Sequence, residues 1–348
     1  MTNGLTFPIH YPYVMEPYFT VVVPTFRRAN ASPSPLLSDC LAALRRQTLP
    51  GNQFEIVVVD EAHDPDTAAL VAQFARQSLI ETRYLAQPMR TSLAAARNRG
   101  WRAARGRYLA FTDDDCQPQP TWLQTAQVMF QRGAQVITGT LRTQAPPLDR
   151  MGQRGTYRAG AHVIDSSDFV AANCFMQRSA LQRAGGFEES FDLAWRVDAD
   201  LQFKLLEIGV PIIKCPEAVV VRLYRPTHWY VTLTDERQNR YDALLYKRHP
   251  ALVRQRMPRD EKLALRYYLT VVSAGLALSG AALALWPMAL VSLLSFGSLT
   301  TWLAAERWAE TPVPQQNAKA TLLTALATPF LSVYWRLYGA VKYRVLYL

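Results

Sequence analysis

Short runs of valine and isoleucine alternate with helix-like segments along the first third of this chain. We expect buried strands at Phe19–Val23, Glu55–Val59 and Tyr108–Thr112, and helices at Leu36–Gln47, Asp66–Arg76 and Ser92–Ala104, the last with Ser92 as its N-cap. This alternation is typical of a parallel sheet covered by helices, in which ligands bind beyond the carboxyl ends of the strands.

The following residues show a less regular pattern. We expect a helix from about Pro120 to Gln131, strands at Val136–Thr140 and Phe169–Phe175, and a helix at Ala199–Ile208. The pattern predicts an α/β domain with a mixed sheet over residues 18–250, divided into two parts, residues 18–118 and 119–250. A tail of residues 1–17 precedes it and lacks the basic start and apolar core of a signal peptide.

The composition changes after His249-Pro250, where residues 251–348 form a predicted membrane region. The run from Leu269 to Ala305 contains no charged residue and is interrupted at Trp286-Pro287. We interpret residues 267–305 as a transmembrane hairpin, with a helical pair buried in a soluble domain, or an anchor that lies on the membrane, as alternatives. The basic and aromatic residues of 320–346 favour a helix at the membrane interface.

Charge supports this interpretation and its orientation. The chain of 348 residues has a net charge of +10, and residues 251–348 contain ten Lys or Arg and four Asp or Glu. Apolar runs in the same segment favour an anionic membrane over nucleic acid as the partner. The four cysteines form no C-x-x-C pair, which fits a reducing compartment. We therefore expect the cytoplasmic membrane, with the N-terminal domain on its cytoplasmic side.

Carboxylates follow two of the predicted strands, Asp60-Glu61 after one and Asp113-Asp114-Asp115 after another. In an extended segment alternate side chains point the same way, so Asp113 and Asp115 can converge. Such carboxylates repel one another unless a cation neutralises them, which predicts Mg²⁺ or Mn²⁺ bound together with phosphates. The competing interpretation is an acidic surface turn.

Further candidates are an aspartate pair and several arginines. Asp198, in Asp198-Ala199-Asp200, is placed to accept a proton from an acceptor hydroxyl, although acidic residues also favour a helix N-terminus. Diphosphate leaving groups need arginine donors. The candidates for this role are Arg97, Arg99, Arg237 and Arg240.

Five segments in order resemble family 2 glycosyltransferases of the GT-A fold over roughly Phe19 to Pro250. They are F-T-V-V-V-P-T-F-R-R, E-I-V-V-V-D-E, A-A-A-R-N-R-G-W-R-A-A-R-G-R-Y-L-A-F-T-D-D-D, G-G-F-E-E-S-F and V-D-A-D-L-Q-F-K-L-L. The resemblance implies a GT-A, Rossmann-like domain that binds a nucleotide-diphosphate sugar, with residues 18–118 as its nucleotide-binding half and residues 119–250 as its acceptor half. It implies inverting, metal-dependent transfer to a hydroxyl acceptor, and the predicted membrane region favours a lipid-linked or cell-envelope acceptor.

The resemblance also implies residue roles. Asp60 and Glu61 would contact base and ribose, Asp113 the nucleotide, Asp115 the metal with Asp113, and Asp198 would be the catalytic base. The candidate donor site also includes Pro24, Thr25, Arg27 and Asp114, and the candidate acceptor side includes Asp200 and Asn173.

The chain departs from the family pattern at several positions. Glu61 replaces a usual aspartate, Val197 stands where the base motif commonly has glutamate, and Q-N-R-Y replaces the Q-x-x-R-W of processive synthases, which favours a single transfer. Two alternative functions remain. An inactive membrane scaffold is suggested only by Val197, and a sugar nucleotidyltransferase would need a glycine-rich loop where P-T-F-R-R stands.

Overall fold

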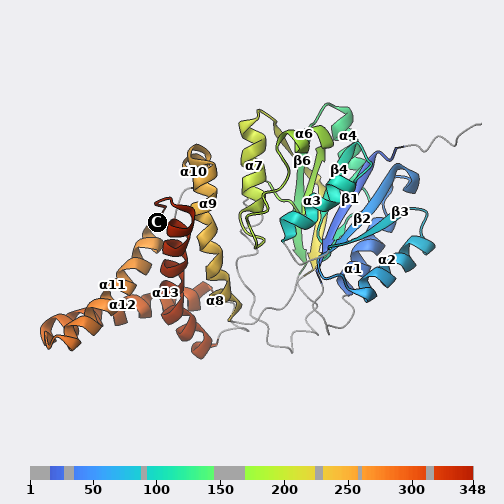
Figure 1. Cartoon of the computed structure of the whole chain (residues 1–348). Coiled ribbons are helices and arrows are strands. Elements are labelled where there is room, and N and C mark those ends of the chain that lie inside the picture. The colour runs from blue at the N-terminus through green and yellow to red at the C-terminus, as the bar shows by residue number, and fades with distance from the viewer. Residues whose placement is uncertain are drawn as a thin grey trace, which may run out of the picture.

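One mixed sheet organises the N-terminal part of the computed structural model, which describes residues 16–26, 35–87, 92–144, 169–223, 230–257, 261–310 and 317–347. Within these residues the strand order is β3-β2-β1-β4-β7-β6-β8-β5 (Figure 1). The strands are β1 (Phe19–Thr25), β2 (Phe54–Asp60), β3 (Glu81–Ala86), β4 (Tyr108–Thr112), β5 (Cys116–Pro118), β6 (Val136–Gln144), β7 (Asn173–Gln177) and β8 (Ile212–Leu223). Strands β1 to β4 pair in parallel, and β7 runs antiparallel to β4 and β6.

Helices cover both faces of this sheet. Side chains of α1, α2 and α4 pack with the sheet in one hydrophobic cluster, and those of α3, α6, α7 and α9 pack in a second. The helices of the domain are α1 (Pro35–Arg45), α2 (Pro65–Gln77), α3 (Leu93–Ala103), α4 (Trp122–Gln131), α6 (Arg178–Arg183), α7 (Val197–Glu207), α8 (Val231–Asp235), α9 (Arg240–Arg248) and α10 (Pro250–Arg256), with short 3-10 turns η1 (Gly51–Gln53) and η4 (Glu236–Asn239). The α/β class with a mixed sheet is therefore confirmed.

The carboxyl ends of β1, β2 and β4 lie at one edge of the sheet because the three strands are parallel neighbours. Thr25 at the end of β1 pairs with Asp60 at the end of β2, and Asp113 follows the last residue of β4 directly. Every residue of these three strands is buried, as expected of strands covered on both faces. The sequence prediction that acidic residues gather at this edge is confirmed.

Three strands were not expected. The edge strand β3 is at least partly exposed throughout and carries charged residues, so its pattern is weak. Strand β5 has three residues, and β8 contains Lys214, Pro216 and Glu217 before its valine run. The strand expected at Phe169 begins only at Asn173, because Asn173 first closes a turn with its backbone N–H on the Val170 carbonyl, at 3.0 Å.

Two long apolar helices, α11 (Glu261–Ala282) and α12 (Trp286–Glu310), pair into a hairpin that extends away from the domain (Figure 1). Lys262–Ala282 and Trp286–Ala309 are each long and apolar enough to cross a membrane. At the base of the hairpin Arg266 pairs with Glu306 at 2.6 Å, and further along the Ser273 and Ser295 hydroxyls lie 3.2 Å apart. The length and composition of both helices are compatible with a membrane region.

Helix α13 (Ala318–Tyr343) returns along the α/β domain and packs against α9 and η4. Gly339 allows the close approach, since a Cβ there would lie 2.5 Å from the Arg240 carbonyl oxygen. Nearby, the Asn239 amide donates to the Ser332 hydroxyl at 3.0 Å, and Trp335 stacks on the Arg240 guanidinium at 5.4 Å. The hairpin is thus joined to the domain through a packed helix.

Candidate active site

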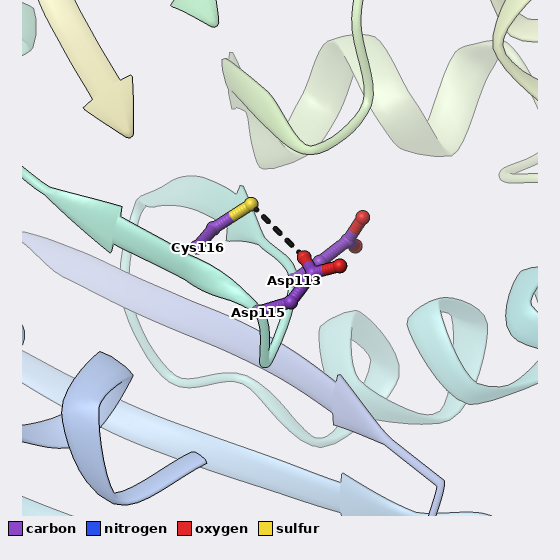
Figure 2. Close-up of side chains that lie close together, drawn as sticks. All are labelled: Asp113, Asp115 and Cys116. Atoms are coloured by element: carbon purple, nitrogen blue, oxygen red, sulfur yellow. Dashed lines mark hydrogen bonds between the residues drawn. The ribbon is translucent and has the colours of Figure 1, made fainter. Parts of the chain in front are cut away.

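The turn after β4 holds Asp113 and Asp115 close together (Figure 2). The Asp113 carbonyl accepts from the Cys116 N–H at 3.1 Å and closes the turn, after which β5 pairs Cys116 with Arg222 of β8. The two carboxylates and the Cys116 thiol lie with their potential ligand atoms within 4.8 Å of one another. The expected convergence of Asp113 and Asp115 is therefore observed.

The donor atoms of this cluster fit a hard divalent cation. Carboxylate oxygens are the ligands that Mg²⁺ prefers and that also suit Mn²⁺. Burial raises the pKa of the Cys116 thiol well above its ordinary value, so the thiol stays protonated and donates toward Asp115 at 3.3 Å. A cation here would be held by the two aspartates.

Two arginines bond to Asp113 from opposite sides. Arg97 donates to Asp113 Oδ1 at 2.8 Å, and Arg222 donates to Asp113 Oδ2 at 2.7 Å. The Arg222 Nε also lies 3.3 Å from Asp115 Oδ1. Both carboxylates keep some exposure, 17% for Asp113 and 19% for Asp115, so they remain reachable from solvent.

Asp198 lies in the first turn of α7, close to Arg97. Its Oδ1 is 3.6 Å from Arg97 Nη1, and its Oδ2 accepts from the Ala171 N–H at 3.0 Å. Surrounding protein atoms raise the pKa of the Asp198 carboxyl, while Arg97 and the Ala171 N–H oppose this rise. With 40% of its side chain exposed, Asp198 can meet a ligand and accept a proton.

Arg97 joins these carboxylates into one site. It projects from α3, is 3% exposed and packs over the Phe187 ring at 5.5 Å. Ser92 is the N-cap of helix α3, as the sequence predicted, and its hydroxyl accepts from the Ala95 N–H at 3.2 Å. One helix therefore connects the β4 turn with α7.

The G-G-F segment fixes the position of that helix. Asn98, next to Arg97, donates to the Phe187 carbonyl at 2.8 Å and accepts from the Phe187 N–H at 2.9 Å. Gly186 has φ +75°, and a Cβ there would lie 2.7 Å from the Asn98 oxygen. Only glycine combines this left-handed backbone with so close an approach.

The candidate residues at the ends of β1 and β2 differ in how far they are exposed to solvent. Asp60 is fully buried and accepts from the Ala62 and Asp64 N–H groups, each at 2.8 Å, and from the Tyr84 hydroxyl at 2.7 Å. It therefore shapes the turn after β2. Glu61 is 9% exposed, and Pro24 is buried in β1 opposite Val59.

The remaining donor-site candidates lie at or near the end of β1. The Thr25 hydroxyl donates to Asp114 Oδ2 at 2.7 Å and joins this strand end to the β4 turn. Arg27 lies outside the described residues.

The acceptor-side assignments of Asp200 and Asn173 are corrected by the structure. Asp200 is fully buried and bonds to Arg248 Nε at 2.6 Å and His249 Nε2 at 3.1 Å. Residues two positions apart on an α-helix point about 200° apart around its axis, which turns Asp200 away from Asp198. Asn173 is also fully buried, and its amide links β7 to backbone carbonyls of Thr140 and Ala218, both at 2.8 Å.

The later arginines are not part of the carboxylate cluster. Arg240 pairs with Asp192 at 2.6 Å and contacts the Tyr241 and Trp335 rings, because η4 and α9 pack on α13. Arg237 is exposed on η4, and Arg99 lines a separate surface hollow beside β3. For none of the three does a described contact with the cluster support the expected diphosphate role, which stays a prediction.

Sequence reasoning missed Arg222 and could not place Val197. Arg222 was missed because β8 was not expected, although a cation ending a valine run is a usable signal. The Val197 side chain is 2% exposed and packs in the second hydrophobic cluster. The position where the resembled family has a glutamate is thus part of the core in this chain.

Comparisons with known proteins identify related glycosyltransferases. The family model described as "Glycosyl transferase family 2" matches residues 20–189. The chain is 31% identical over 124 residues to Glycosyltransferase AglE of Haloferax volcanii, covering 36% of each chain. It is 33% identical over 230 residues to Validoxylamine A glucosyltransferase of Streptomyces hygroscopicus, covering 56% of this chain and 53% of that one. The chain thus spans a third to a half of these relatives.

A solved structure shares the fold. The mannosyltransferase PcManGT from Pyrobaculum calidifontis, in complex with GDP-Man and Mn²⁺, superposes with a TM-score of 0.51 at 19% identity, over 94% of this chain and 87% of that one. At this identity the likeness supports the GT-A fold and not the substrate.

Proposed function

We propose that the chain moves one sugar from a nucleotide-diphosphate donor to a hydroxyl acceptor with inversion. The premise is its membership of the family 2 glycosyltransferases, which rests on the match over residues 20–189. The observation that carries the proposal is the position of Arg97, 2.8 Å from Asp113 and 3.6 Å from Asp198. One buried guanidinium contacts both the carboxylate proposed for the donor side and the carboxylate proposed as base.

Asp198 is the proposed general base. Its carboxylate takes the proton of the acceptor hydroxyl while that oxygen forms a bond to the anomeric carbon and the bond to the diphosphate breaks. A raised pKa makes Asp198 a stronger base than an ordinary aspartate, while its ion pair with Arg97 favours the ionised form. Attack opposite to the leaving group inverts the anomeric centre.

The donor side is proposed to use the strand-end residues. Glu61, on the turn that the buried Asp60 shapes, and Thr25, next to the buried Pro24, would lie along base and ribose, and Asp113 to Asp115 would lie near the diphosphate. Arg222 can stabilise the leaving diphosphate after it exchanges its carboxylate partners for phosphate, while Arg97 adds positive charge from its place beside Asp113. A divalent cation held by Asp113 and Asp115 would add positive charge to the leaving group.

The proposed acceptor is lipid-linked or part of the cell envelope. The hairpin of α11 and α12 places large apolar side chains in the open, among them Leu278 at 75% and Leu283 at 69% exposure. Such a surface suits lipid contact. Cations near the hairpin base favour the cytoplasmic side for the catalytic domain.

Purified full-length protein incubated with a panel of nucleotide sugars and lipid extract tests the proposal. We expect release of nucleoside diphosphate together with a glycosylated product, and loss of both when a chelator is present. Pyrophosphate exchange would indicate a nucleotidyltransferase. Binding of nucleotide without any release would indicate an inactive scaffold.

A further inference from the structure

Arg222 contacts both carboxylates that are proposed to hold a metal. Its Nη2 donates to Asp113 Oδ2 at 2.7 Å, and its Nε lies 3.3 Å from Asp115 Oδ1. Pairing of β5 with β8 aligns it directly with Cys116 in the same turn. The guanidinium therefore lies across the two aspartates.

We propose that Arg222 is an internal cation that competes with the divalent metal for Asp113 and Asp115, so that metal and nucleotide diphosphate bind cooperatively. The inference rests on the proposed function and concerns the coupling between metal and nucleotide binding, which that function alone does not determine. It assigns Arg222 a role in ligand binding that the sequence did not suggest.

The competition follows from shared oxygens. A cation bound to Asp113 and Asp115 would share these carboxylates with the Arg222 guanidinium, which bonds to Asp113 Oδ2 and pairs with Asp115 Oδ1, and the two positive groups would repel each other at such distances. Metal alone must therefore displace Arg222 and leave its charge in a setting where only 22% of the side chain is exposed.

A diphosphate removes this cost. Its oxygens accept hydrogen bonds from a guanidinium in the same forked geometry as a carboxylate. Arg222 can then bond to phosphate while the carboxylates turn to the metal. Each ligand consequently favours the other, and this coupling is reciprocal.

Arg222 is better suited to this exchange than Arg97. Arg97 is 3% exposed, packs over Phe187 and pairs with both Asp113 and Asp198. Arg222 is more open and bonds to the β4–β5 turn alone among the contacts seen in the described residues. Arg97 therefore serves as the fixed counter-ion and Arg222 as the one that changes partner.

Direct titration of Mn²⁺ into the full chain, without a sugar donor, tests the inference. Mn²⁺ binding is measured alone and then with saturating UDP or GDP, in wild type, Arg222→Gln and Arg222→Lys. Arg142→Gln is the matched control, because Arg142 is an exposed arginine on the neighbouring strand β6, opposite Val221.

We expect nucleoside diphosphate to tighten Mn²⁺ binding to wild type about tenfold. Arg222→Gln should bind Mn²⁺ alone about tenfold more tightly than wild type and lose most of the coupling. Arg222→Lys, which keeps a charge but not the fork, should lie between them, and Arg142→Gln should match wild type.

Two results would overturn the inference. One is unchanged Mn²⁺ affinity and unchanged coupling in Arg222→Gln. The other is wild-type protein that binds Mn²⁺ equally well with and without nucleotide. Failure of every variant to bind Mn²⁺ under any condition would overturn the proposed metal dependence as well, while nucleotide-sugar turnover without metal would leave transfer itself intact. Thermal unfolding in chelator checks that the variants are folded.

Discussion

Asp198 and Asp200 lie two residues apart on α7, yet their carboxylates face opposite surroundings. Asp198 is 40% exposed and lies 3.6 Å from Arg97, whereas Asp200 is fully buried against Arg248, His249 and Lys204. Their pKa values shift in opposite directions: surrounding protein atoms raise the pKa of Asp198, whereas at Asp200 the charged partners outweigh burial and lower it. One short motif thus supplies a candidate base and an anchor for the helix that carries it.

Substitution of the two aspartates should separate these roles. Asp200→Asn leaves Arg248 and Lys204 without their buried counter-charge, so we expect a loss of about 3 kcal/mol in unfolding free energy. Asp198→Asn, at a partly exposed site, should change the unfolding free energy by less than about 1 kcal/mol in either direction. Chemical denaturation of both variants in detergent measures this difference. Equal losses would contradict the division of roles.

His249 should make this anchor depend on pH. Its imidazole lies 2.8 Å from Glu207 and 3.1 Å from Asp200, and these carboxylates raise its pKa although burial opposes them. Because the folded pKa lies above the unfolded value, the charged histidine stabilises the fold fully below the unfolded pKa. This contribution disappears as pH rises through the folded pKa.

The difference in unfolding free energy between wild type and His249→Gln should therefore be largest in mild acid and shrink toward alkaline pH. Arg248 and Lys204 also face Asp200, so the comparison is made at constant ionic strength. A difference that grows with pH would show that His249 is not charged in the fold.

Glycines in the helical region provide a test of how α13 docks. A methyl group at Gly339 would lie 2.5 Å from the Arg240 carbonyl oxygen, whereas nothing lies within 4 Å of one at Gly297 on α12. We expect Gly339→Ala to lose about 1–3 kcal/mol through overpacking. Gly297→Ala should be neutral or slightly stabilising, because alanine favours helix. The unfolding midpoint should fall in Gly339→Ala and should stay unchanged or rise slightly in Gly297→Ala.

The regular part of the fold could be predicted because its signals are local. Val21 to Val23, Ile56 to Val59 and the serine N-cap at Ser92 are strong patterns within a few residues, and strand ends determine where Asp60 and Asp113 lie. Parallel pairing then brings those ends together. No long-range information was needed for this step.

The remaining site residues depend on contacts between distant segments. Arg222 reaches Asp113 only because β5 and β8 pair across more than a hundred residues, and Asn173 is buried by Trp122, Thr140 and Ala218. Both facts follow from tertiary packing. A motif such as D-A-D also does not reveal which carboxylate faces the site until the helix has a neighbour.

The orientation of the hairpin can be measured by cysteine labelling in intact cells. Trp286 lies at the start of α12 and is 67% exposed, while the four native cysteines are at most 3% exposed and should react little. Trp286→Cys should react with an impermeant maleimide from outside if the hairpin spans the membrane. Labelling only after lysis would indicate an anchor on the inner face.

The most direct test of the account is the single-turnover transfer rate of Asp198→Asn at saturating donor. We expect a loss of more than about a hundredfold, because the amide keeps the shape but cannot take a proton, with donor affinity unchanged. The wild-type rate should also fall as pH drops through a pKa above that of an ordinary aspartate, since only the ionised carboxylate is active. The variant should lack this pH dependence. Retention of half the wild-type rate in Asp198→Asn would contradict the assignment of Asp198 as the base.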